Sequence, residues 1–176
     1  MTEEILLPAQ KLRKLTSNLE LMDVIYIRGV HEIRIYPSNF ESEFVEIGNK
    51  IEILKTDYDN KNGLLNVFVN MKVEGKVGND EYAQKVGLPK EDKDPVVLID
   101  VTYATLFRQK SLDVDFKQDE IEIFARTNAV YNVYPYLRQY VQEVSMKFGI
   151  TPILIPFLRP LSANQINDLF KTPVET

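Results

Sequence analysis

The sequence predicts an α+β fold: a four-stranded antiparallel sheet followed by a helical C-terminal third, in a single domain over residues 1–176. Up to Phe107 most apolar residues alternate with polar ones, as in half-buried strands, whereas after Asp119 they recur at helical spacing. The 44% hydrophobic and 27% charged content suits one globular domain. Strands that precede helices, instead of alternating with them, favour an antiparallel sheet.

The first strand is predicted within residues 12–36, where alternation around Gly29 and His31 indicates a long or interrupted strand. The turn formers Pro37, Ser38 and Asn39 end it.

The second and third strands are predicted at residues 51–58 and 65–73. The turn formers of residues 59–63, which end in Gly63, join them as a hairpin. Because residues 65–73 keep strict period-two alternation, one face of this strand is expected to be buried and the other partly wet.

A charged insertion is predicted at about residues 75–95, with Pro89 inside it and room for one helical turn. Alternation resumes at Val97 and continues to Phe107. This fourth strand closes a predicted meander, in which successive strands are antiparallel neighbours.

The C-terminal third is predicted to hold three helices. Acidic residues at Asp119 and Glu120 favour the start of a short helix that ends near Asn128. A longer helix should end at Gly149, and Pro135 lies either in its first turn or at a kink. Ser162 opens a capping box for a last short helix. The apolar stripe of the long helix comprises Val133, Leu137, Val141, Val144 and Phe148.

Composition excludes several classes of protein. A net charge of -5 with no clustering of basic residues disfavours nucleic-acid binding. The longest apolar runs are far shorter than the roughly 20 residues of a spanning helix, so membrane insertion is not expected. The absence of cysteine, together with an N-terminal segment unlike a secretory signal, predicts a cytoplasmic location.

The sequence contains no arrangement suited to catalysis, so we expect no enzyme, no cofactor and no metal. His31 is the sole histidine and lies within a strand pattern, which favours a structural role. Asp57, Asp59 and Asn62 lack the spacing of a calcium loop, and no phosphate-binding glycine motif occurs.

Three surface features admit more than one interpretation. The acidic run from Asp113 to Glu122 fits a docking patch or a solvated face, and its composition favours the solvated face. The tyrosines of residues 131–140 suit a core edge or a subunit contact better than a ligand site. The apolar residues of 153–158 lie between prolines, so regular strand pairing cannot bury all of them and some are expected to bind an extended chain.

The segment from Tyr134 to Val141, Tyr-Pro-Tyr-Leu-Arg-Gln-Tyr-Val, with Gly149 and the proline-rich loop behind it, resembles the signature region of the SecB family of export chaperones. The resemblance is strongest over residues 129–160. It implies a SecB-type fold, with helices packed on one face of the sheet, assembled as a homotetramer that is a dimer of dimers. It also implies that Leu98 and Asp100 dock the translocase motor ATPase.

The chain departs from the export members of that family in two respects that bear on docking of the motor. It carries the charged insertion after Gly75 and ends soon after Phe170 with no acidic tail. In this it is similar to the SecB-like chaperones associated with toxin-antitoxin systems, whose clients are aggregation-prone antitoxins. Unfolded preproteins and antitoxin-like polypeptides are therefore both expected clients.

The function that follows is that of an ATP-independent holdase, which covers apolar segments of unfolded chains. The alternative is a non-catalytic adaptor with one fixed, folded partner. The predicted client groove is lined by Ile153, Ile155, Phe157, Ile166, Leu169 and Phe170. The predicted oligomer interface comprises Val133, Tyr136, Leu137, Tyr140, Val141 and Val144.

Overall fold

The computed structural model describes residues 7–89 and 94–170. The N-terminal residues of the signal prediction and part of the predicted insertion, residues 1–6 and 90–93, lie outside this range. The elements follow in the order α1 (Pro8–Asn18), β1 (Leu19–Ile33), η1 (Pro37–Asn39), η2 (Ser42–Phe44), β2 (Val45–Asp59), β3 (Leu64–Val77), α2 (Asp80–Lys85), β4 (Val97–Gln109), α3 (Gln118–Phe124), η3 (Ala125–Ala129), α4 (Val130–Lys147) and α5 (Ala163–Leu169).

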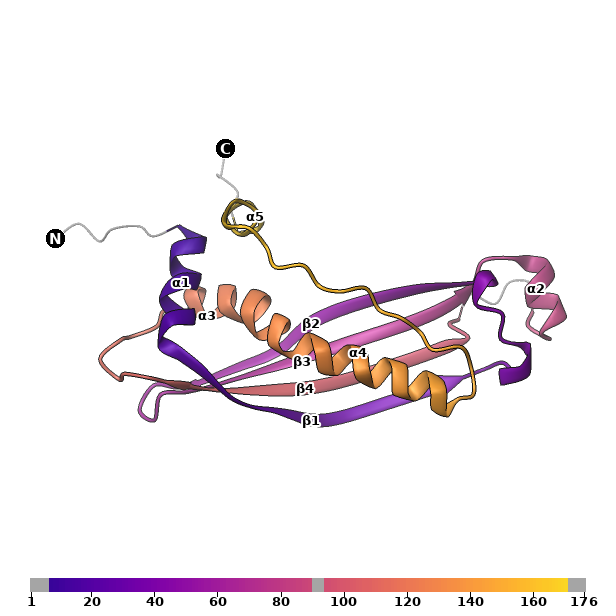
Figure 1. The fold of residues 1–176 in the computed structure, drawn as a ribbon, viewed down its shortest axis with the longest axis horizontal. Coiled ribbons are helices and arrows are strands. Elements are labelled where there is room, and N and C mark those ends of the chain that lie inside the picture. The colour runs from indigo at the N-terminus through magenta and orange to yellow at the C-terminus, as the bar shows by residue number, and fades with distance from the viewer. Residues whose placement is uncertain (1–6, 90–93, 171–176) are drawn as a thin grey trace.

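The predicted fold class is confirmed: four antiparallel strands form one sheet, and α4 lies along one of its faces (Figure 1). The order of the strands, however, is β1-β4-β3-β2 and not that of a simple meander. Strands β2 to β4 do form hairpin-connected neighbours, but β1 pairs with β4 from Leu19–Gln109 to Ile33–Val97. This is a Greek-key order, and it leaves β1 and β2 at the two edges.

The start of the chain also differs from the prediction, because residues 12–18 are helical and belong to α1. Pro8 occupies the first turn, where its missing N–H costs nothing, and the Gln10 side chain accepts a hydrogen bond from the Leu7 N–H at 2.7 Å. Leu15 is buried beneath the helix. Lys14 reaches the buried carboxylate of Glu120 at 2.9 Å and so fixes α1 against α3.

The two predicted central helices form one continuous helical run. Between α3 and α4 the backbone stays helical but widens into the π-helical turn η3, where the Val130 N–H bonds to the Ala125 carbonyl five residues earlier. Pro135 therefore lies inside a helix that begins well before it. Gly149 ends the run with φ 72°, which confirms the predicted cap.

The core lies between the sheet and this helical run. The helix-facing residues of β3 are fully buried, and they are Leu65, Val67, Val69, Met71 and Val73. Opposite them lies the predicted stripe of α4, buried at Val133, Leu137, Val141 and Val144. The alternation in β3 and the stripe in α4 are thus two sides of the same core.

A cluster of tyrosines packs α4 against the edge strand β1. The Tyr140 ring stacks on Tyr26 with 5.8 Å between ring centroids. Gly29 makes room for it, because a Cβ at this position would lie 2.0 Å from the Tyr140 hydroxyl oxygen. Burial, followed by the hydrogen bond with Tyr26, raises the pKa of Tyr140 to about 12.

We predict that Tyr140 ionises about two pH units above an exposed tyrosine in a spectrophotometric titration. Since its pKa is raised on folding, its contribution to stability is complete below pH 10 and is lost as the pH rises towards 12. Replacing Tyr26 with Phe removes the hydrogen bond and should lower this pKa. Tyr36→Phe, at a residue that is 79% exposed, is the control. A high-pH transition that does not respond to Tyr26→Phe would contradict the assignment.

Candidate functional site

The candidate site is built around an extended segment, residues 151–161, which we call the C-terminal strap. It begins just after the Gly149 cap and runs back along α4 to the start of α5 (Figure 1). Pro152, Pro156 and Pro160 each lack a backbone N–H. The strap therefore carries an apolar sequence without forming a strand.

Side chains alternate along the first half of the strap. Ile153 and Ile155 point into the core and are 6% and 3% exposed, whereas Leu154 and Phe157 point outward and are 73% and 81% exposed. The prediction that Ile153 and Ile155 line an open groove is therefore wrong for this protomer. Prolines prevent strand pairing, but they do not prevent burial against a helix.

The strap is anchored by polar side chains of α4. The Tyr134 hydroxyl donates to the Pro156 carbonyl at 2.6 Å, and Arg138 Nε donates to the Ile155 carbonyl at 2.7 Å. Ser145 Oγ accepts the Ile153 N–H at 3.1 Å while donating to the Val141 carbonyl at 2.6 Å. These bonds satisfy strap backbone groups that the sheet does not pair.

Two of these anchors, Tyr134 and Arg138, belong to the Tyr-Pro-Tyr-x-Arg segment. Their positions on α4 explain why both side chains reach the strap. Tyr134 and Arg138 are four residues apart, so both side chains lie on one face of α4. The Arg138 guanidinium also lies 3.8 Å from the centre of the Phe157 ring. It thereby holds an exposed aromatic ring in a fixed place.

We predict that Arg138→Ala loosens the strap. The variant loses a hydrogen bond from a charged group and the contact with Phe157. Its free energy of unfolding, measured in urea, should therefore be about 1–2 kcal/mol lower than that of wild type. Amide exchange should accelerate over residues 153–158. The matched control is Arg28→Ala, at an exposed arginine of β1. Unchanged exchange in the strap of the Arg138 variant would show that these bonds do not hold it.

Beside the strap, a cavity of about 800 Å³ opens along the edge strand β2, and we call it the β2 cavity. Ile51 and Ile53 of β2 face Val130 across it, while Leu169 and Phe170 lie at its C-terminal end. A smaller cavity of about 230 Å³ lies further along the same edge, between Ile47 and Leu154. Strand β2 pairs only with β3 within the described residues, so its outer backbone groups stay available for hydrogen bonds.

The last helix, α5, places the remaining predicted groove residues. Ser162 caps it as predicted, with Gln165 closing the capping box. Ile166 is 7% exposed, so it contributes little open surface to the predicted groove. Leu169 is 62% exposed and Phe170 is half-buried at the β2 cavity.

The predicted oligomer interface is not supported at four of its six residues. Val133, Leu137, Val141 and Val144 are at most 2% exposed within one protomer, because they pack on its own sheet. A side chain without accessible surface cannot contact a second copy. Of the other two, Tyr136 is 45% exposed and Tyr140 is half-buried.

Leu98 and Asp100 lie on the other face of the sheet, since Val97, Ile99 and Val101 face the helices. Both are half-buried, and Asp100 accepts a hydrogen bond from the Asn70 amide at 2.7 Å. Lysines pair with most acidic residues around Asp100, in the bridges Lys50–Glu52, Lys72–Glu74 and Lys76–Glu74. This face is therefore separate from the strap and electrostatically mixed.

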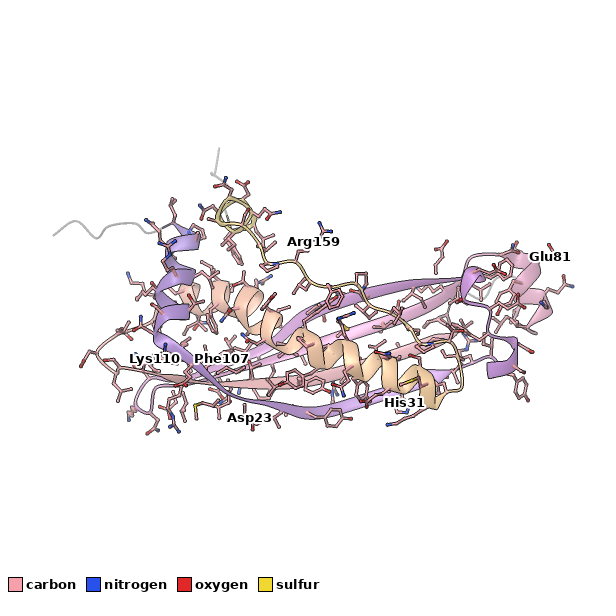
Figure 2. All side chains as sticks on the ribbon, viewed as in Figure 1. Asp23, His31, Glu81, Phe107, Lys110 and Arg159 are labelled. Carbon is pink, nitrogen blue, oxygen red and sulfur yellow. The ribbon has the colours of Figure 1, made fainter. Side chains whose placement is uncertain are left out.

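Groups suited to chemistry do not converge at the strap. His31 is exposed, and its ring makes an edge contact with Phe148 at 5.4 Å, in keeping with a structural role (Figure 2). Within residues 7–89 and 94–170, no cluster of three or more potential metal ligands occurs. In the same part of the chain, none of the helices has the length and apolarity to cross a bilayer.

Comparison with known proteins gives matches to SecB-like chaperones. The chain is 24% identical over 102 residues to the SecB-like chaperones Rv1957 and MT2006, from two strains of Mycobacterium tuberculosis. Each match covers 56% of this chain and 55% of the relative, so the chain spans about half the length of the curated relatives it matches. No family model matches.

A solved structure matches over more of the chain. It is the Rv1957 SecB-like chaperone of M. tuberculosis in complex with a ChAD peptide from the Rv1956 HigA1 antitoxin. The match has a TM-score of 0.69 and 18% identity, and covers 86% of this chain and 99% of the other. These comparisons confirm the SecB-like resemblance and the SecB-like fold that the sequence predicts.

Proposed function

We propose that this protein is an ATP-independent holdase that binds unfolded or aggregation-prone polypeptides. The observation that carries the proposal is a row of exposed apolar side chains, along the anchored strap and α5, beside an open sheet edge. These side chains are Leu154, Phe157, Leu158, Leu161 and Leu169. Exposed apolar residues that are clustered and rigidly placed are typical of an interaction surface.

Binding follows from the properties of unfolded chains, which expose apolar side chains and unpaired backbone groups. An extended client segment can pair with the free edge of β2 and place alternate side chains in the β2 cavity and against Phe157. Such binding is an equilibrium that needs no nucleotide. It draws clients away from aggregation by mass action, and it leaves folded proteins, which bury these groups, alone.

Two classes of client fit this surface. Antitoxin-like polypeptides are supported by the Rv1957 structure, whose partner is an antitoxin peptide. Unfolded preproteins, kept competent for export, fit by the same physical chemistry. A cytoplasmic location agrees with both classes and with a chain that has no cysteine.

In the export role, a second partner is expected to dock on the opposite sheet face. Leu98 and Asp100 lie there, away from the strap, so a motor ATPase could dock while a client is bound. The lysine–carboxylate pairs on this face reduce its negative potential. We therefore expect docking to be weak, and dependent on salt concentration.

For assembly as a homotetramer, the structure favours the β1 edge over the buried stripe of α4. Ile25, Ile27 and Val30 of β1 are 43%, 46% and 58% exposed. Tyr26 of the same strand and Tyr136 of α4 are 49% and 45% exposed, and both rings contact Tyr103. Apolar residues along an unpaired edge suit pairing with a second copy. Light scattering should give about four times the 20.4 kDa mass of one chain.

The proposal is tested by light scattering from a chemically unfolded protein diluted into buffer. Equimolar chaperone assembly should suppress the aggregation, and the native form of the same protein should not bind. No suppression at this ratio would reject the holdase. Pull-downs that return one folded partner and no unfolded chains would favour the adaptor instead.

A further inference from the structure

A second apolar pocket lies between the turn η3, the end of the strap and α5, and we call it the turn pocket. Its volume is about 340 Å³, enough for one large side chain and its neighbour. Its apolar lining comes from Leu12, Val130, Leu158, Leu161 and Ile166. Arg126 and Val130 line both cavities, so the two are adjacent along the helix.

The polar lining of the turn pocket consists of hydrogen-bond donors and lacks carboxylates. Arg126, Thr127 and Asn128 come from the π-helical turn η3, and Arg159 comes from the strap. Widened turns of this kind are frequent at functional sites, because they redirect side chains that a regular helix would align differently. Arg159 lies on the outer rim of the strap (Figure 2).

Some of these donors are already engaged, since the Thr127 hydroxyl donates to the Ile123 carbonyl at 2.6 Å. Arg126 uses Nε and Nη2 on a single oxygen of Glu122, at 3.1 and 2.9 Å, which leaves other guanidinium N–H groups. Within the described part of the chain, neither Arg159 nor the side-chain amide of Asn128 has a polar partner. An apolar pocket bordered by unpaired donors is complementary to an apolar group next to an anion.

We propose that the turn pocket binds client segments in which an apolar side chain adjoins the side-chain carboxylate of Asp or Glu. The apolar side chain enters between Leu158 and Val130, and the carboxylate bonds to Arg126 and Asn128 with Arg159 closing over it. Arg126 lines both cavities, so one client segment can occupy the turn pocket and the β2 cavity together. The carboxylate is therefore expected to be a side chain within the client and not its C-terminus. This inference rests on the proposed holdase function and gives it a sequence preference.

The test uses two short fluorescent peptides with amidated C-termini, which differ only in Leu-Asp-Leu against Leu-Asn-Leu. Binding is followed by fluorescence anisotropy with the full chain. The Asp peptide should bind roughly fivefold more tightly, as expected for one charge-assisted contact that stays partly solvated. The difference should shrink as salt is added.

Matched variants locate the effect. The preference for Asp should disappear in Arg126→Gln/Arg159→Gln and weaken in Arg159→Gln alone, which removes no polar contact within the described structure. It should persist in Arg28→Gln, which removes the same charge from an exposed site on β1.

Each contrary result has a distinct meaning. Equal affinity of the two peptides for the wild-type chain overturns the preference, while the holdase proposal stands. If neither peptide binds but aggregation is still suppressed, the turn pocket is not a client site. If neither peptide binds and aggregation proceeds, both proposals fail.

Discussion

Replacing Leu137 with aspartate is expected to unfold the protomer. Leu137 is fully buried at the centre of the α4 stripe, against the sheet. A carboxylate there loses its hydration inside the hydrophobic core, and the apolar contacts of the leucine are lost as well. The expected cost is above about 4 kcal/mol, a large part of the stability of an ordinary domain.

Far-UV circular dichroism and urea unfolding measure this effect. The matched control is Gln142→Asp, which places the same charge at an exposed position of the same helix. Its free energy of unfolding should lie within about 0.5 kcal/mol of the wild-type value. A folded Leu137→Asp protein that merely dissociates into monomers would contradict the structure and restore the predicted interface role of the stripe.

Replacing Leu154 and Phe157 together with serine is expected to weaken binding of unfolded clients at least tenfold and to leave the fold intact. Both side chains are mostly exposed, so their removal exposes no cavity in the core. Each substitution removes the roughly 1.5–3 kcal/mol of binding free energy that a large apolar side chain contributes when a client covers it. The unfolding free energy should fall by only about 1 kcal/mol, chiefly from the lost contact with Arg138.

Client affinity is measured by anisotropy with a labelled, unfolded protein, and stability by urea unfolding of the same samples. Leu112→Ser is the control, because Leu112 is also exposed, at 60%, but lies outside the strap. It should bind clients as wild type does. If the strap variant binds clients normally, the exposed strap residues do not form the client site.

Much of the fold was predictable because its signals are local. The alternation of residues 65–73, the turn at Gly63 and the cap at Gly149 each depend on a few neighbouring residues, and the structure confirms them. Helix α1 was missed because its apolar residues, Leu12 and Leu15, directly precede the alternating pattern of β1. Two apolar residues at helical spacing are a weaker signal than the long strand pattern that follows them.

The wrong predictions concern contacts between residues far apart in the sequence. Pairing of β1 with β4 joins Leu19 to Gln109, and no local pattern specifies which edge a first strand joins. The burial of Ile153 and Ile155 depends on hydrogen bonds between the strap and the side chains of Tyr134, Arg138 and Ser145. The spacing of Tyr134 and Arg138 on one helix face was the signal that could have indicated a bound segment.

Site-specific crosslinking tests the central claim most directly, and a chain without cysteine makes it simple. Single cysteines at Leu154, Phe157, Leu98 and Leu112 carry a photoactivatable group, and each protein is irradiated with an unfolded client. Crosslinks should form at Leu154 and Phe157 and be absent at Leu98 and Leu112. Crosslinks concentrated at Leu98, or equal at every position, would show that clients do not bind along the strap.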